Sequence, residues 1–320
     1  MHNDANQQEL KQRRLKALEY ALGTLVMDAL RDPHVVEVML NDDGSLWIEK
    51  NGEMKRVGEI SAHDGMAILN QVSTALNDEL TIENPFVEGE LPLDGSRFEG
   101  VAPPVVERPI FAIRKKATQI FTLNDYVRNN VLTFTQAEEL RKAITEEKNI
   151  LVIGGTGSGK TTFCNALLHE VSVLCPEVRM FLLEDTRELQ CSLKNRVFMR
   201  GNVTVSLARI AIATQRLRPD RISVGEVRAG DAALSLLKLW NTGHPGGMAT
   251  VHANSAYEGL TRLDQLIQEV SLNPQRVLIA QAVHYAVFLK RTNSGRKIEE
   301  IVRINGYDQI EQKFDVEVVG

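Results

Sequence analysis

Apolar and polar positions recur with two different periods in the first part of the chain. Apolar residues spaced three or four apart predict an amphipathic helix over 9–31, with a stripe made of Leu15, Leu18, Leu22, Leu25 and Ala29. Two strand-like runs, VVEVML and SLWIEK, flank turn-forming residues and predict a hairpin. A second helix is expected over 62–80, and strands broken by Pro and Gly over 86–115. Residues 1–120 are therefore expected to form an α+β domain of their own.

The pattern changes in the second part of the chain. Residues 121–148 are expected to form a linker that ends in a connecting helix, with Thr135 as its N-cap and Glu138 completing a capping box. From residue 149 the apolar runs ILVIGG, FLLEDT, ISVGEV and GMATVHA alternate with helix-like segments. This alternation predicts an α/β domain over 149–320, with a mostly parallel sheet that helices cover on both faces.

Composition narrows the class of protein. The chain has 320 residues and a formal net charge of -5 at pH 7, which argues against a protein that coats nucleic acid. The sequence shows no secretory signal and no run of about 18 apolar residues, so we expect a soluble protein or one that touches membranes only from the side. Cys164, Cys175 and Cys191 lack the spacing of a zinc site and are expected to be reduced thiols.

The segment 154–161 matches the phosphate-binding pattern G-x-x-x-x-G-K-[ST], with a strand-like run before it and a helix-like run after it. Its glycines allow backbone N–H groups to turn toward phosphate oxygens, and the helix N-terminus adds partial positive charge. We expect Lys160 to reach the β- and γ-phosphates of ATP and the Thr161 hydroxyl to bind Mg²⁺. The remaining nucleotide contacts expected here are Gly155, Thr156, Gly157, Ser158 and Gly159 of this segment and Thr162 directly after it.

Three acidic residues close two of the strand-like runs. Glu184 and Asp185 end FLLED, and Glu226 ends ISVGE. Because the carboxyl ends of parallel strands meet at one edge of a sheet, these carboxylates are expected beside the phosphate loop. Glu226 is the expected general base, Glu184 a second catalytic carboxylate and Asp185 a Mg²⁺ ligand. Gly225 stands where many P-loop proteins place a Mg²⁺-binding aspartate, so the division of the metal role among these acids stays open.

Two histidines bracket a glycine-rich bend and the last strand-like run. His252 follows that strand, where it is expected to hydrogen-bond the γ-phosphate or the attacking water. A zinc site formed with His244 is the alternative, but the sequence offers no third ligand nearby. His252 is therefore a candidate catalytic residue.

These blocks, in this order, resemble the motifs of the secretion traffic ATPases, the superfamily of type II secretion, type IV pilus and type IV secretion motors. GGTGSGKTT resembles their Walker A motif, MFLLEDTREL their Asp box, RPDRISVGEVRAGDA their Walker B motif and NTGHPGGMATVHANS their His box. The form of the last block and the lack of a four-cysteine zinc module are most similar to the conjugal-transfer ATPases of the VirB branch. The resemblance implies a RecA-like P-loop NTPase domain preceded by a smaller, PAS-like α+β domain.

The resemblance also implies properties that the residues alone do not establish. Arg97 in DGSR and Arg114 in FAIRK match the family's nucleotide-facing arginines, whereas Arg108 stays undecided. ATP with Mg²⁺ is implied between the two domains of each subunit of a homohexameric ring. The implied location is cytoplasmic and peripheral at the inner membrane, with the proteins of a conjugation or secretion channel as partners.

Three functions stay open at this point. The first is a motor in which ATP hydrolysis moves the domains and energises substrate transfer or pilus assembly. The second is a nucleic-acid-stimulated translocase, which the acidic net charge and the lack of interleaved aromatic and basic residues disfavour, so no stable direct binding to nucleic acid is expected. The third is a nucleotide-gated assembly scaffold with little turnover.

Overall fold

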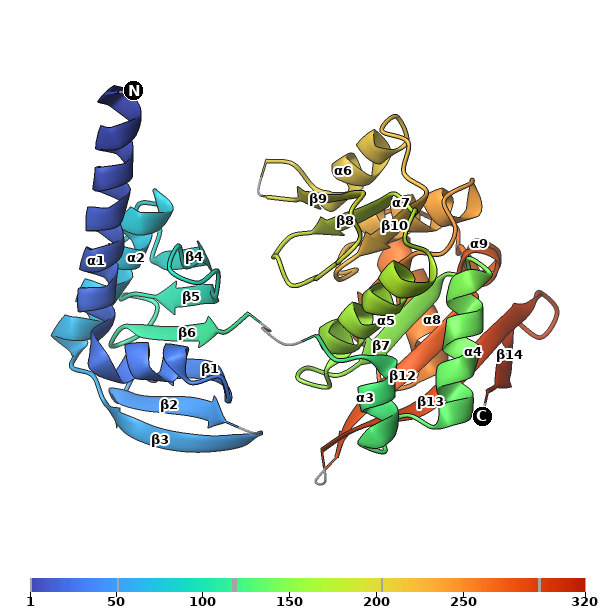
Figure 1. Ribbon diagram of the computed structural model, residues 1–320, viewed down its shortest axis with the longest axis horizontal. Helices are drawn as coiled ribbons and strands as arrows, with labels where there is room; N and C mark the ends of the chain where they lie inside the picture. The colour runs from blue at the N-terminus through green and yellow to red at the C-terminus, as the bar shows by residue number, and fades with distance from the viewer. Residues whose placement is uncertain (1, 51, 117–119, 203, 293–294, 320) are drawn as a thin grey trace. The chain divides into compact units, whose positions relative to one another are not determined.

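The chain divides into two compact units, residues 1–118 and 119–320, and each has its own hydrophobic core (Figure 1). None of the described helices combines the length and the apolar character that crossing a bilayer requires. The computed structural model describes residues 2–50, 52–116, 120–202, 204–292 and 295–319.

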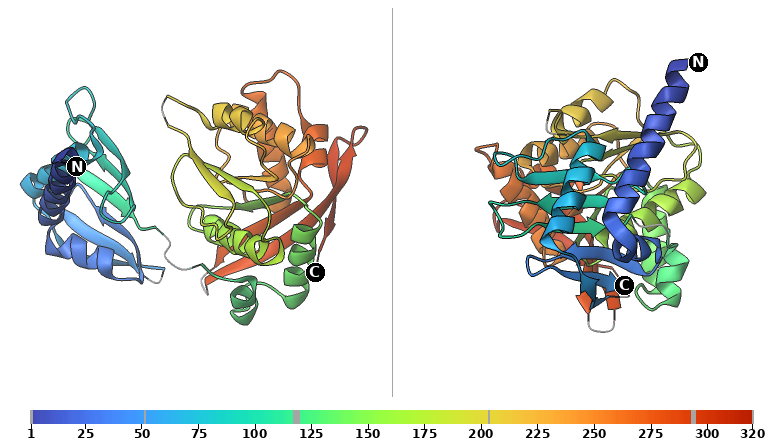
Figure 2. Two further views of the ribbon diagram at one scale, coloured as in Figure 1. Left: turned by 45° about the horizontal axis from the view of Figure 1, so that its top comes forward. Right: turned by 90° about the vertical axis from the view of Figure 1, so that its left-hand side faces the viewer.

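Unit 1 is a six-stranded antiparallel sheet in the order β3-β2-β1-β6-β5-β4. Figure 2 shows α1 and α2 side by side on one face of this sheet, and alternate strand residues such as Phe98 and Ile113 are buried in this core. The expected α+β architecture is confirmed. The elements are α1 His2–Arg31, β1 Val35–Leu40, β2 Ser45–Lys50, β3 Glu53–Glu59, α2 Ala62–Leu76, β4 Phe86–Glu90, β5 Arg97–Val101 and β6 Ile110–Arg114.

Both helices of unit 1 differ in detail from their sequence pattern. Gly23 has a non-helical backbone (φ 71°, ψ 173°) that interrupts α1 and shifts its periodicity. As a result Leu25, expected in the apolar stripe, is 43% exposed, and Val26 is buried in its place. The second helix ends at Leu76 rather than at residue 80, because Asn77 adopts a left-handed conformation that terminates the helix.

Unit 2 is an eight-stranded sheet in the order β14-β13-β12-β7-β11-β10-β8-β9. The strands from β12 to β9 in this order pair in parallel, and β13 and β14 add an antiparallel edge. One core lies against α3, α4 and α5 and the other against α6 to α9, so helices cover both faces, as predicted. The elements are α3 Leu123–Arg128, α4 Phe134–Thr145, β7 Ile150–Gly154, α5 Lys160–Leu174, β8 Met180–Glu184, β9 Arg196–Arg200, α6 Leu207–Thr214, β10 Arg221–Val224, α7 Gly230–Asn241, β11 Met248–Val251, α8 Ala256–Gln268, α9 Arg276–Ala282, β12 Tyr285–Thr292, β13 Gly295–Asp308 and β14 Lys313–Val318.

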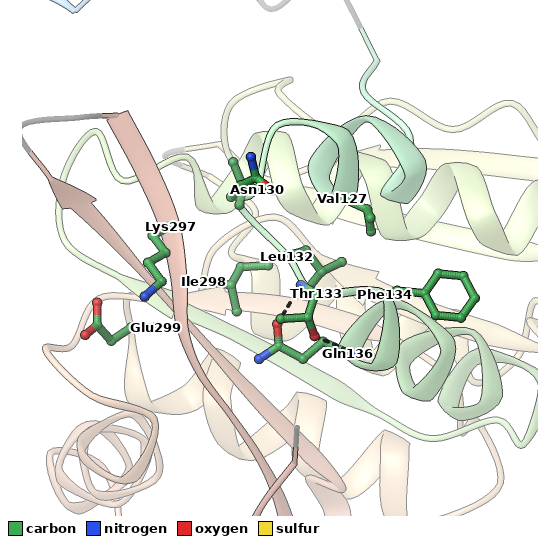
Figure 3. A pocket seen from close by; sticks show the side chains of 10 residues that line it. Val127, Asn130, Leu132, Thr133, Phe134, Gln136, Lys297, Ile298 and Glu299 are labelled. Atoms are coloured by element: carbon green, nitrogen blue, oxygen red, sulfur yellow. Dashed lines mark hydrogen bonds between the residues drawn. The ribbon is translucent and has the colours of Figure 1, made fainter.

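Residues 121–148, expected as a linker with one helix, contain two helices that pack on unit 2. Leu123 of α3 and Leu140 of α4 share a core with α5. The expected N-cap of α4 is wrong by two residues. Thr133 caps this helix in a reciprocal capping box with Gln136, in which each side chain accepts a hydrogen bond from the other's backbone N–H (Figure 3). The Thr-Phe-Thr sequence offers two candidate caps, each with Glu or Gln three residues later, and Thr133 is the one with the extended backbone of an N-cap (φ -78°, ψ 158°).

Candidate active site

The segment that matches the phosphate-binding pattern joins the end of β7 to the start of α5 (Figure 1). Gly157 (φ +70°) and Gly159 (φ +93°) adopt a backbone conformation that residues with side chains rarely reach. Gly159 is the N-cap of α5 and has no side chain with which to occupy the first N–H groups of the helix. These groups and the helix dipole favour an anion at this end of α5. The Ser158 hydroxyl is buried without a hydrogen-bond partner among the described residues, as expected in a loop shaped around a further group.

Lys160 occupies the first turn of α5 and is only 7% exposed. Its ammonium donates a hydrogen bond to the Gly155 carbonyl at 3.0 Å. The same nitrogen lies 3.3 Å from Nδ1 and 3.4 Å from Nε2 of His252. The loop lysine is therefore held between its own loop and the residue that follows β11.

His252 connects the loop lysine to the carboxylate of Glu226. Its Nε2 lies 2.7 Å from Oε1 of Glu226. Burial and the nearby charge of Lys160 lower the pKa of His252, and the Glu226 carboxylate opposes this shift. A lowered pKa keeps the imidazole neutral at pH 7, so the ring can accept a hydrogen bond from the lysine ammonium. Lys160, His252 and Glu226 therefore lie in series, and the contact between His252 and Glu226 has the distance of an ion pair but not the geometry of a hydrogen bond.

Glu226 lies two residues beyond the end of β10 rather than at the strand end, because β10 stops at Val224. Its side chain is 19% exposed, and Oε2 accepts a hydrogen bond from Nε of Arg228 at 2.6 Å. Arg228 was not singled out by the sequence patterns, although it belongs to the same block as Glu226. Oε1, which faces His252, is buried without a hydrogen-bond partner among the described residues, and such an atom is suited to bind a water molecule in the site.

Glu184 closes β8 and is held differently from Glu226. It is 4% exposed, and its Oε1 accepts hydrogen bonds from the backbone N–H groups of Glu188 at 2.9 Å and Leu189 at 2.6 Å. Burial raises the pKa of Glu184, and the two N–H groups partly oppose that shift. The side chain packs on Gly225, where an added β-carbon would lie 2.9 Å from Cγ of Glu184. Glu184 thus fills the space that an aspartate at position 225 needs.

Thr161 and Asp185 provide the oxygen atoms suited to Mg²⁺. Thr161 is in the first turn of α5, and Asp185 directly follows β8. Burial and the negative charge of Glu226 raise the pKa of Asp185, whereas Arg228 lowers it. Within the part of the chain that the structure describes, no three His, Cys, Asp or Glu side chains form a complete metal site. Mg²⁺ in nucleotide sites takes most of its ligands from phosphate and water, so one hydroxyl and one carboxylate fit this ion.

Arg97 and Arg114 lie together in unit 1. Arg97 begins β5, Arg114 ends β6, and the two are direct partners in the antiparallel register. Glu37 of β1 faces Arg114 across the other side of that strand. Burial raises the pKa of Glu37, and both arginines oppose this shift, so three charged side chains gather on one face of the sheet.

A cavity of about 470 Å³ lies beside the loop that joins α3 and α4 (Figure 3). Its lining includes Val131, Phe134, Lys297 and Glu299. None of the site residues expected from the sequence lines it, so this cavity is separate from the candidate site.

The chain matches the family model described as "Type II/IV secretion system protein" over residues 24–302. It is 47% identical over 304 residues to a probable conjugal transfer protein TrbB of Sinorhizobium fredii, with 93% of each chain covered. A conjugal transfer protein TrbB of Rhizobium radiobacter is 45% identical over 296 residues, which cover 92% of this chain and 91% of the relative. The crystal structure of the pilus retraction motor PilT with bound ADP shares the fold, with a TM-score of 0.63, 18% identity and coverage of 92% of this chain and 82% of that one. The chain therefore belongs to the type II/IV secretion system protein family.

Proposed function

We propose that this protein binds ATP at the loop between β7 and α5 and hydrolyses it to ADP and phosphate. The observation that carries the proposal is the series Lys160–His252–Glu226, because it brings a partly exposed carboxylate close to the lysine of the loop. Membership of a family of secretion ATPases supports the same activity.

Each residue of the site has a role in this reaction. The N–H groups of Gly155 to Thr162 and the Lys160 ammonium bind the phosphates and favour the charge that develops during transfer. Glu226 accepts the proton of the attacking water, and His252 contacts the γ-phosphate or that water. Glu184, fixed by two backbone N–H groups, holds the chain after β8 in place. Thr161 and Asp185 would hold Mg²⁺, which supplies positive charge to the β- and γ-phosphates.

We further propose that the reaction drives a homohexameric motor of a type IV secretion system that transfers DNA by conjugation. The names of the relatives in Sinorhizobium fredii and Rhizobium radiobacter support this assignment. Such a motor works on the cytoplasmic side, peripherally at the inner membrane, and its partners are channel proteins. Hydrolysis moves the two units relative to each other and energises substrate transfer or pilus assembly.

Assembly is expected to control turnover. ATP hydrolysis per subunit should rise with protein concentration, and particles with nucleotide should have several times the mass of one 35.7 kDa chain. Phosphate release and light scattering on the same samples measure both quantities. Single-stranded DNA should leave the rate unchanged within about twofold, because the acidic chain repels phosphate backbones. A monomeric protein with full ATPase activity would contradict the proposed ring. Strong stimulation of hydrolysis by DNA would favour a translocase, and negligible ATP turnover would favour a scaffold.

Arg97 and Arg114 are proposed to contact the nucleotide from unit 1. Arginine suits this role, because its planar guanidinium donates two hydrogen bonds to phosphate and keeps its charge. Arg97→Ala and Arg114→Ala should each lower the turnover of the full chain by about tenfold or more, since hydrogen bonds to charged groups contribute strongly. The thermal unfolding temperature of unit 1 should change little.

Arg56→Ala is the matched control for this experiment. Arg56 is an exposed arginine of the same sheet and pairs only with its neighbour Glu59 among the contacts described. Its replacement should leave turnover near that of the wild type. Equal losses for Arg56 and for the arginine pair would show a general charge effect of unit 1 and contradict a specific nucleotide contact.

A further inference from the structure

Two arginines near the C-terminal edge of unit 2 belong to no motif identified in the sequence. Arg291 is near the end of β12, and Arg296 is near the start of β13. The two strands are antiparallel neighbours, and these residues are direct partners in their register. Directly opposed residues lie on the same face of a sheet, so the two guanidinium groups emerge side by side. Both side chains are exposed.

This arginine pair lies against the phosphate loop. Nε of Arg296 donates a hydrogen bond to the carbonyl of Gly157 at 3.2 Å. A β-carbon added at Gly159 would lie 2.9 Å from Cδ of Arg296, and one added at Gly157 would lie 3.5 Å from Nη1 of Arg291. The two glycines with left-handed backbone are thus the part of the loop that faces the pair. Segments more than 130 residues apart in sequence meet here.

We propose that Arg291 and Arg296 bind the α- and β-phosphates of the nucleotide within the same subunit, in addition to the phosphate loop. The inference rests on the proposed nucleotide site and extends it by a second set of cationic ligands. The N–H groups of such loops surround the α- and β-phosphates, whereas the loop lysine reaches toward the γ-phosphate. Guanidinium groups beside Gly157 and Gly159 therefore act on the phosphates that ATP and ADP share. Arg296 is itself fixed beside the loop by its hydrogen bond to the Gly157 carbonyl.

The same two strands provide a matched control. Lys290 and Lys297 are the neighbouring register pair: Lys290 precedes Arg291 on β12, and Lys297 follows Arg296 on β13. Because side chains alternate between faces, these lysines emerge on the opposite face from the arginines. They carry the same charge at the same end of the sheet and are also exposed. A general effect of positive charge predicts equal consequences for both pairs, and a phosphate site predicts consequences for the arginine pair alone.

The test is a fluorescence titration of the full-length protein with mant-ADP and with a non-hydrolysable mant-ATP analogue, at low and high NaCl. Arg291→Ala/Arg296→Ala should weaken the binding of both nucleotides by about tenfold at low salt, the scale of a lost charge-assisted contact. The factor should be the same for the two nucleotides. The difference in affinity between wild type and variant should shrink at high salt. Salt screens the arginine–phosphate contacts of the wild type, and the variant no longer has these contacts. Lys290→Ala/Lys297→Ala should stay within about twofold of the wild type.

Three results would overturn the proposal. The first is unchanged nucleotide affinity in the arginine variant, and the second is equal weakening of binding in both double variants. The third is a loss of affinity that does not depend on salt, because such a loss shows that the arginines only support the structure of the loop. If the double variant unfolds at a lower temperature than the wild type, the titration is repeated with Arg291→Gln. This variant leaves the contact of Arg296 with Gly157 in place. A Lys160→Ala variant identifies failure of the proposed function itself: if it binds and hydrolyses nucleotide like the wild type, the phosphate site is elsewhere.

Discussion

Lys160→Ala is expected to abolish ATP hydrolysis while the protein stays folded. The substitution removes the ammonium group that the phosphate loop directs at the transferred phosphate, together with its contacts to Gly155 and His252. An interaction of this kind with transition-state charge accounts for a large part of the rate in phosphoryl transfer. The helix should survive, because alanine has the highest helix propensity. Phosphate release, with circular dichroism on the same sample, measures the result.

Lys142→Ala is the matched control for this variant. Lys142 is an exposed lysine of α4 in the same unit, and its ion pair with Glu146 is long, at 4.0 Å. Surface pairs of this kind contribute little, so turnover should equal that of the wild type. Wild-type turnover in a well-folded Lys160→Ala protein would rule out the proposed phosphate site.

Glu226→Gln is expected to lower turnover by about a hundredfold or more while ATP still binds, because an amide keeps the shape of the side chain but cannot accept a proton. The carboxylate is oriented by Arg228 and lies beside His252, and it remains partly exposed. Single-turnover hydrolysis and nucleotide titration separate the chemical step from binding.

The comparison with Glu184→Gln decides between the two glutamates. Glu184 accepts two backbone hydrogen bonds through one oxygen, and the oxygen of a glutamine can accept the same two bonds. This variant should therefore retain much more activity than Glu226→Gln. If Glu184→Gln loses far more activity than Glu226→Gln, the roles of the two residues are reversed.

Local sequence patterns predicted the elements that carry the candidate site. The phosphate loop depends on glycines at fixed offsets between a buried strand and a helix, and each of these signals lies within about ten residues. The strands before Glu184, Glu226 and His252 are short apolar runs, and parallel pairing brings their ends to one edge of the sheet. That arrangement follows from the general rules of α/β proteins, so the sequence was sufficient for it.

Other features depend on contacts between distant segments, which local patterns do not contain. The neighbourhood of Arg296 and Gly157 arises from the pairing of β12 with β7 in the folded sheet. The exposure of Leu25 follows from one glycine conformation within a helix that is otherwise periodic. The cap of α4 required a choice between two threonines, which is settled by the backbone geometry before the helix.

The close packing of Glu184 on Gly225 limits which residues homologous sequences can carry at these two positions. An aspartate at position 225 would bring its β-carbon within 2.9 Å of Cγ of Glu184, so the two positions cannot both carry these side chains without a shift of the backbone. Substitution at one position therefore changes which residues the other tolerates. We expect the two positions to vary as a coupled pair, with any side chain at 225 accompanied by a shorter residue at 184. An alignment of homologous sequences can test this covariation without an experiment on the protein.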